Sequence, residues 1–139
     1  MEDDLKLSEK IEDFLREAEK LLKENDYGRA AYQEMLAAKA AASTRDFKTA
    51  AELYERAGEH FLKDRDYDFS SKNFRNAAKL FMKIENFEKA KDLFLKAAEC
   101  FSLLRDDNSY KECILGAAKS LEKLGRTQEA ENLKRKLLN

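Results

Sequence analysis

The 139-residue sequence lacks proline and tryptophan, and it has only four glycines, two cysteines and one histidine. Because proline and glycine are the strongest helix breakers, their scarcity favours long helices, and no glycine-rich phosphate loop is present. No run approaches the ~20 apolar residues that cross a bilayer. Residues 1–4 are acidic, whereas a secretion signal would begin basic and continue apolar. We therefore expect a cytoplasmic protein with no integral membrane segment.

Residues that carry chemistry are equally scarce. The single histidine, His60, has no spaced aspartate, cysteine or second histidine that would suggest a catalytic or metal site. Cys100 and Cys113 form neither a zinc-binding pattern nor a disulfide framework. The net charge of -1 and the lack of a recognisable motif argue against nucleic acid as a partner. The sequence thus predicts no enzyme activity, no cofactor and no metal.

What the sequence does contain is a repeat of twenty residues. Aromatic side chains recur at Tyr27, Phe47, Tyr67 and Phe87, each directly after Asp or Asn. A small residue follows three positions later, and a pair of small residues follows ten positions later. Of the fourteen aromatic residues, only Tyr32 and Phe69 lie outside the repeating columns. Such a fixed period indicates one structural unit that is repeated along the chain.

Each copy of the repeat has the pattern of one helix. Its apolar residues fall at steps of three and four, as in Phe47, Ala50, Tyr54, Ala57 and Phe61. The Asp or Asn before the first aromatic is well suited to cap a helix. Alternating rings and small residues let neighbouring helices approach closely. A simple antiparallel bundle has the same spacing and is the alternative, but its seams are usually Leu and Ile.

We therefore predict an all-α, right-handed α-solenoid of seven antiparallel helices. It forms a single domain over residues 1–139, which begins with an acidic lead-in at residues 1–7. The helices are expected near residues 8–24, 28–44, 47–63, 67–83, 87–104, 110–124 and 127–138. The sixth copy, carried by Tyr110, Cys113 and Ala117, is interpreted as displaced by three residues. The displacement is assigned to residues 105–109, expected to be the longest connection.

The columns resemble the tetratricopeptide family, in which Ala, an aromatic four residues later and Ala three residues after that recur in one helix. Ala90, Phe94 and Ala97 match this pattern. Two helices here take about 40 residues rather than 34, which looks most similar to the soluble NSF attachment proteins (SNAPs). That resemblance implies an adaptor that lies along SNARE helical bundles and recruits a AAA ATPase. The family's apolar N-terminal loop and acidic C-terminal tail are not evident in this sequence.

One predicted helix carries a stripe of positive charge. Four cations follow one another at steps of three and four, with no acidic residue between Asp68 and Glu85. Lys72 and Asn76 also match the first element of the clamp by which some tetratricopeptide domains hold a carboxylate, but the clamp is incomplete. A solvated face is the alternative. The predicted partner-binding residues are Lys72, Arg75, Asn76, Lys79 and Lys83. We expect that changing Lys72, Arg75 and Lys79 to Glu leaves the melting temperature nearly unchanged and weakens partner capture.

The predicted function is a non-enzymatic adaptor that binds a helical or extended segment of another protein. Residues 1–70 have a net charge of -6 and residues 71–139 one of +5. A self-assembling scaffold, held together by salt-sensitive association of these two halves, is therefore an alternative. A second alternative is a tetratricopeptide-type co-chaperone without a complete carboxylate clamp.

Overall fold

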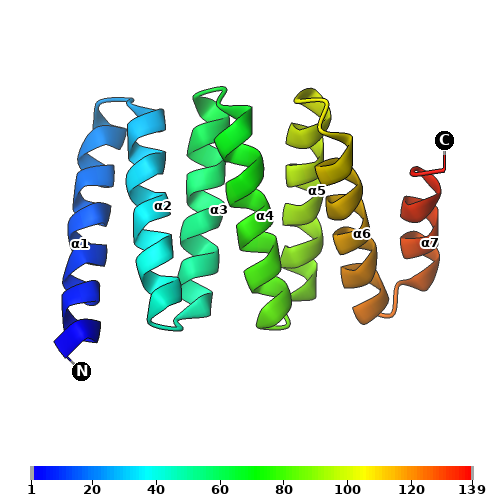
Figure 1. Ribbon diagram of the computed structural model, residues 1–139, viewed down its shortest axis with the longest axis horizontal. Coiled ribbons are helices and arrows are strands. Elements are labelled where there is room, and N and C mark those ends of the chain that lie inside the picture. The colour runs from blue at the N-terminus through cyan, green and yellow to red at the C-terminus, as the bar shows by residue number, and fades with distance from the viewer. Residues whose placement is uncertain (1, 139) are drawn as a thin grey trace.

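The computed structural model describes residues 2–138, and within this range it consists of seven helices joined by short turns. Figure 1 shows the helices side by side in one row, alternating in direction, with the two ends of the chain at opposite ends of the row. Each helix packs against the helix before it and the helix after it. The prediction of an all-α solenoid of seven antiparallel helices is confirmed. The helices are α1 (Glu2–Lys23), α2 (Tyr27–Ser43), α3 (Phe47–Lys63), α4 (Tyr67–Lys83), α5 (Phe87–Leu103), α6 (Asp107–Lys123) and α7 (Thr127–Arg135).

The turns repeat as strictly as the helices. In the turn between α3 and α4, Arg65 has a φ of 60° and its amide donates to the Leu62 carbonyl. The Asp66 amide then donates to the Phe61 carbonyl at 2.9 Å, which completes a Schellman motif. The Asp66 side chain accepts from the Phe69 amide at 3.1 Å and so caps α4. The same left-handed conformation recurs every twenty residues, at Asn25, Arg45, Arg65, Glu85, Arg105 and Gly125.

The observed helix ends differ from the predicted ends by more than one residue at three places. Helix α1 begins at Glu2, so residues 2–7 of the segment expected as a lead-in are helical. Helix α6 begins at Asp107, because Asp106 caps it through the Ser109 amide. The predicted three-residue displacement was therefore wrong: this turn has the same length as the others, and Tyr110 stands in the column of small residues. Helix α7 ends at Arg135, and residues 136 and 137 form a turn.

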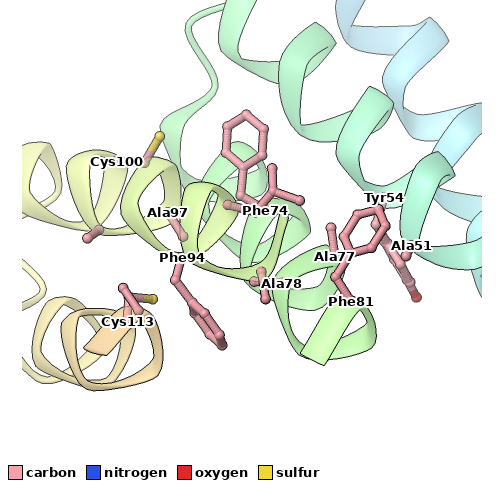
Figure 2. Packing of buried hydrophobic residues seen from close by; sticks show 14 of the residues in the cluster. Ala51, Tyr54, Phe74, Ala77, Ala78, Phe81, Phe94, Ala97, Cys100 and Cys113 are labelled. Atoms are coloured by element: carbon pink, nitrogen blue, oxygen red, sulfur yellow. The ribbon is translucent and has the colours of Figure 1, made fainter. Parts of the chain in front are cut away.

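The core explains the alternation of rings and small residues. A Cβ atom on Gly58 would lie 2.6 Å from the ring of Phe74, so the ring of α4 rests on the backbone of α3. Gly116 receives the ring of Phe94 in the same way, at 2.7 Å. Figure 2 shows Phe74 and Phe94 together with alanines of α4 and α5, among them Ala77 and Ala97. One apolar cluster runs without interruption from Ala31 in α2 to Leu133 in α7. Within residues 2–138, no helix combines the length and apolar character needed to cross a bilayer.

Candidate partner-binding surfaces

The structure shows that the predicted positive stripe on α4 is partly neutralised by α6. The Arg75 guanidinium lies 3.7 Å from a carboxylate oxygen of Glu112, and Lys79 Nζ lies 3.1 Å from the other oxygen. Arg75 also donates to Ser109 Oγ at 3.5 Å. One carboxylate from a different helix thus serves two of the four cations. The sequence has no acidic residue between Asp68 and Glu85, and it could not show that Glu112 of α6 lies beside Arg75 and Lys79.

The remaining stripe residues have different surroundings. Arg75 is only 22% exposed, and its guanidinium lies 5.0 Å from the centre of the Phe101 ring. Lys83 Nζ lies 4.4 Å from the Phe47 ring centre. Lys72 pairs with Asp68 at 3.3 Å, and Asn76 is exposed. The stripe is therefore a mixed surface in which Arg75 is largely packed.

A second surface is a hollow of about 370 Å³ on the edge of the row where the α1–α2 and α3–α4 turns lie (Figure 1). Tyr32 from α2 and Phe69 from α4 are 46% and 39% exposed. They are the same two aromatic residues that the repeat columns leave out. The hollow is lined by Glu17, Leu21, Asp26, Gly28, Arg29, Tyr32, Gln33, Phe61, Asp64, Asp66 and Phe69.

The inner wall of the hollow is aromatic. The ring of Phe69 stacks on the buried ring of Phe61, with centroids 5.0 Å apart and planes 18° apart. Gly28 lies in the first turn of α2, and a Cβ atom there would lie 2.5 Å from a carboxylate oxygen of Asp64. The missing side chain thus lets the Asp64 carboxylate lie against the first turn of α2.

The rim of the hollow is acidic, with four carboxylates and one guanidinium. Asp26 caps α2 through the Arg29 amide at 3.3 Å and also binds the Arg29 guanidinium at 3.2 Å. Asp66 caps α4. Within residues 2–138, neither Glu17 nor Asp64 takes part in an ion pair, so both carboxylates remain available to a ligand. The arrangement suits a group that is cationic at its tip and flat or apolar along its stem.

A buried ionic cluster lies between α2 and α3. The Glu34 carboxylate is inaccessible to solvent, and its two oxygens lie 2.5 Å from His60 Nδ1 and 3.0 Å from the Arg56 guanidinium. The His60 ring stacks on Tyr27 at 6.1 Å. Among the residues that the structure describes, no group of three or more His, Cys, Asp or Glu side chains is arranged to hold a metal ion. The cluster therefore links two helices and lies inside their contact.

The two thiols are buried as well. Burial raises the pKa of Cys100, although a contact with the Ser70 hydroxyl at 3.7 Å acts in the opposite direction. Burial raises the pKa of Cys113 to about 12. Because the thiolate is the reactive form, both side chains behave as small apolar groups near neutral pH.

The fold and these surfaces define an all-α helical-repeat solenoid with a shallow acidic and aromatic hollow at one edge. No family model and no curated protein matches the chain. Among solved structures it is similar to BtubC (BKLC) from P. vanneervenii, with a TM-score of 0.59 and 19% sequence identity. The match covers 95% of this chain and 53% of that one, so this chain spans about half of its length. At this identity the likeness shows the fold alone.

Proposed function

We propose that this protein is a non-enzymatic, tetratricopeptide-like interaction module that binds a helical or extended segment of another protein in the hollow between α2 and α4. The observation that carries the proposal is the pair Tyr32 and Phe69. Both rings are exposed, neither belongs to the columns that build the core, and both line the same hollow. Exposed aromatic side chains beside a recess are the usual anchors of protein interfaces.

A segment seated in the hollow has a natural continuation along α4. Phe69, Lys72 and Asn76 follow one another at steps of three and four, and all three are exposed. They therefore lie on one face of the helix. This arrangement gives part of the predicted stripe a role beside the hollow: Lys72 and Asn76 would contact the same partner outside its anchor.

The finer proposal is a SNAP-like adaptor that works in the cytoplasm, with a SNARE-type helical bundle or a AAA ATPase as its partner. It is supported by the resemblance of the repeat columns and by helices α2 to α6, which all have 17 residues. These helices are long for a 34-residue tetratricopeptide pair.

Selection from a displayed library of random short peptides tests the proposed function without a known partner. We expect recovered peptides to bind the wild-type chain at least about tenfold more tightly than a Tyr32→Ala/Phe69→Ala double variant, because aromatic anchors carry much of an interface's energy. A Leu103→Ala/Leu115→Ala variant is the matched control, since it removes exposed apolar side chains elsewhere. Failure to recover any binder, or equal affinity for the double variant, would contradict the proposal.

The alternative of a self-assembling scaffold is favoured by the separation of charge between the two halves of the chain. Light scattering of the purified protein at low and high salt distinguishes it from the adaptor. Oligomers that form without any other protein and dissociate at high salt would support the scaffold.

A further inference from the structure

We infer that the hollow between α2 and α4 takes an arginine side chain from the partner segment. This inference rests on the proposed function and names the chemistry of the bound group. Three features of the described residues support it: the exposed rings, the carboxylates without an ion-pair partner, and the arginine that covers the equivalent ring one helical pair later.

The exposed rings of the hollow have no cation of the chain beside them. At some other rings a cation lies over the face, as Lys63 does over Tyr27 at 5.0 Å and Lys96 over Phe74 at 5.6 Å. Within residues 2–138, no cation lies over Tyr32 or Phe69, which are 46% and 39% exposed. Phe61 covers one face of Phe69. The ring surface that remains exposed attracts a guanidinium, and more strongly when the contact is shielded from water.

The second feature is the charge of the rim. Glu17 from α1 and Asp64 from the end of α3 have no ion-pair partner within the described residues, and the rim as a whole is acidic. A guanidinium is planar and has five N–H donors, so it can stack on a ring and bind a carboxylate at the same time. An ammonium group has neither the plane nor the fork, so arginine fits this combination better than lysine.

The third feature is an arginine of the chain that contacts the equivalent ring one helical pair later. Forty residues after Met35, Phe61 and Phe69 stand Arg75, Phe101 and Ser109. Arg75 lies over the ring of Phe101 and binds Ser109. In the first pair of helices the corresponding side chain is the apolar Met35, and a hollow lies beside Phe61 and Phe69. An arginine from a partner would contact Phe61 as Arg75 contacts Phe101. Lys72 stands at the position of Glu112, so the carboxylate partners of that arginine would be Glu17 and Asp64.

The inference is tested with four synthetic peptides, acetyl-Ala-Ala-X-Ala-Ala-amide, in which X is arginine, citrulline, lysine or norleucine. Amide shifts in ¹⁵N spectra of the full chain report binding. We expect the arginine peptide to shift residues 28–33 and 64–69 and to bind about tenfold more tightly than the citrulline peptide, which has the same shape without the charge. Lysine should lie between them.

Three variants make the test specific. Asp64→Asn should weaken arginine binding about threefold to tenfold, whereas Glu112→Gln, which removes a carboxylate beside the occupied position, should leave it unchanged. Met35→Arg should abolish binding, because the new side chain can lie over Phe61 as Arg75 lies over Phe101. Circular dichroism checks that this variant folds. If it does not fold, the Asp64→Asn variant still tests the inference.

Equal affinity for the arginine and norleucine peptides would overturn the inference and leave the proposed function intact, since peptides would still bind in the hollow. The absence of shifts at residues 28–33 and 64–69 with every peptide would also overturn it, while the display selection judges the function separately. If the same residues shift with protein concentration alone, a second copy is the occupant and the inference of a partner fails.

Discussion

Two successive pairs of helices, α2–α3 and α4–α5, share the same turns and caps but differ in the chemistry between them. Matched positions lie forty residues apart, and several of them differ in kind; among these, Glu34 becomes Phe74, Met35 becomes Arg75 and His60 becomes Cys100. The helices nevertheless keep the same length and the same cap geometry. The turns therefore maintain the solenoid, and the residues between the helices are free to vary.

Inside the molecule, the difference is an exchange of a ring for a carboxylate. Lys96 of the second pair lies over the Phe74 ring, and its counterpart Arg56 in the first pair binds the Glu34 carboxylate. The cation is kept in both pairs. A ring face and a carboxylate are thus alternative partners for the same long basic side chain, and each holds two neighbouring helices together.

At the surface, the two pairs differ in whether a side chain of the protein covers the ring near the turn. In the second pair Arg75 reaches over Phe101 to Ser109 and Glu112. In the first pair a hollow with exposed rings and carboxylates that have no ion-pair partner lies beside the equivalent Phe61. The same edge of the molecule is therefore hollow beside Phe61 and covered by the chain's own Arg75 beside Phe101.

The largest effect should come from removing the ring of the second pair. Phe74→Ala should lower the free energy of unfolding by about 3–5 kcal/mol, because the side chain is fully buried against Gly58. Glu34→Leu at the matched position should cost only about 1 kcal/mol, since Arg56 is 52% exposed and returns to water. Urea unfolding of both variants measures the difference, and a larger loss for Glu34→Leu would contradict this view of the two pairs.

Charge reversal should separate Arg75 from its neighbours in the stripe. Arg75→Glu places a carboxylate beside Glu112 and over a ring, so we expect a loss of about 2–3 kcal/mol. Lys72→Glu should cost no more than about 0.5 kcal/mol, as it adds only a like charge one turn from Asp68. Thermal unfolding followed by circular dichroism compares them. Equal melting temperatures would restore the expectation that the whole stripe is a solvated face.

The fold was predictable because rings, small residues and caps recur in fixed columns, and each column has one physical role. The displacement assigned to the sixth copy shows the limit of that reasoning. Asp107 stands where an aromatic is expected and Tyr110 where a small residue is expected, so the aromatic column suggested a shift. The turn at Arg105 has the usual left-handed conformation, which only the backbone shows.

The surfaces were less predictable, because they depend on side chains that meet between helices two apart in the sequence. Tyr32 and Phe69 could be recognised as residues outside the columns, but their convergence on one hollow requires α2 and α4 to lie close together. Arg75 and Glu112 likewise meet from α4 and α6. A single-helix pattern assigns a face to a residue but does not identify its neighbour across a groove.

The thiol of Cys113, which lies buried in α6, gives a pH-dependent prediction. The other thiol, Cys100, stands at the position of His60 in the first pair. Burial raises the pKa of Cys113 from 9.0 to about 12. Between these values the unfolded chain binds fewer protons than the folded chain, so stability should fall as pH rises, by up to about 1.4 kcal/mol per pH unit. Urea titrations between pH 8 and 11 measure the slope. Cys113→Ala should reduce it, and an unchanged slope would show that other groups cause the loss.

The smallest effects test whether the two pairs have equivalent turns. Arg65 and Arg105 occupy matched positions with φ values of 60° and 58°, a conformation that costs a side chain about 1 kcal/mol. Arg65→Gly and Arg105→Gly should relieve that cost and lose part of the gain to the more flexible unfolded chain, for a net stabilisation of about 0.5 kcal/mol each. Gly125→Ala, at a φ of 78°, should destabilise by about 1 kcal/mol. Guanidinium unfolding of the three variants measures these changes. If the stability changes of Arg65→Gly and Arg105→Gly differ in sign, the side chains between the helices affect the stability of the turns. The turns of the two pairs could then no longer be treated as equivalent.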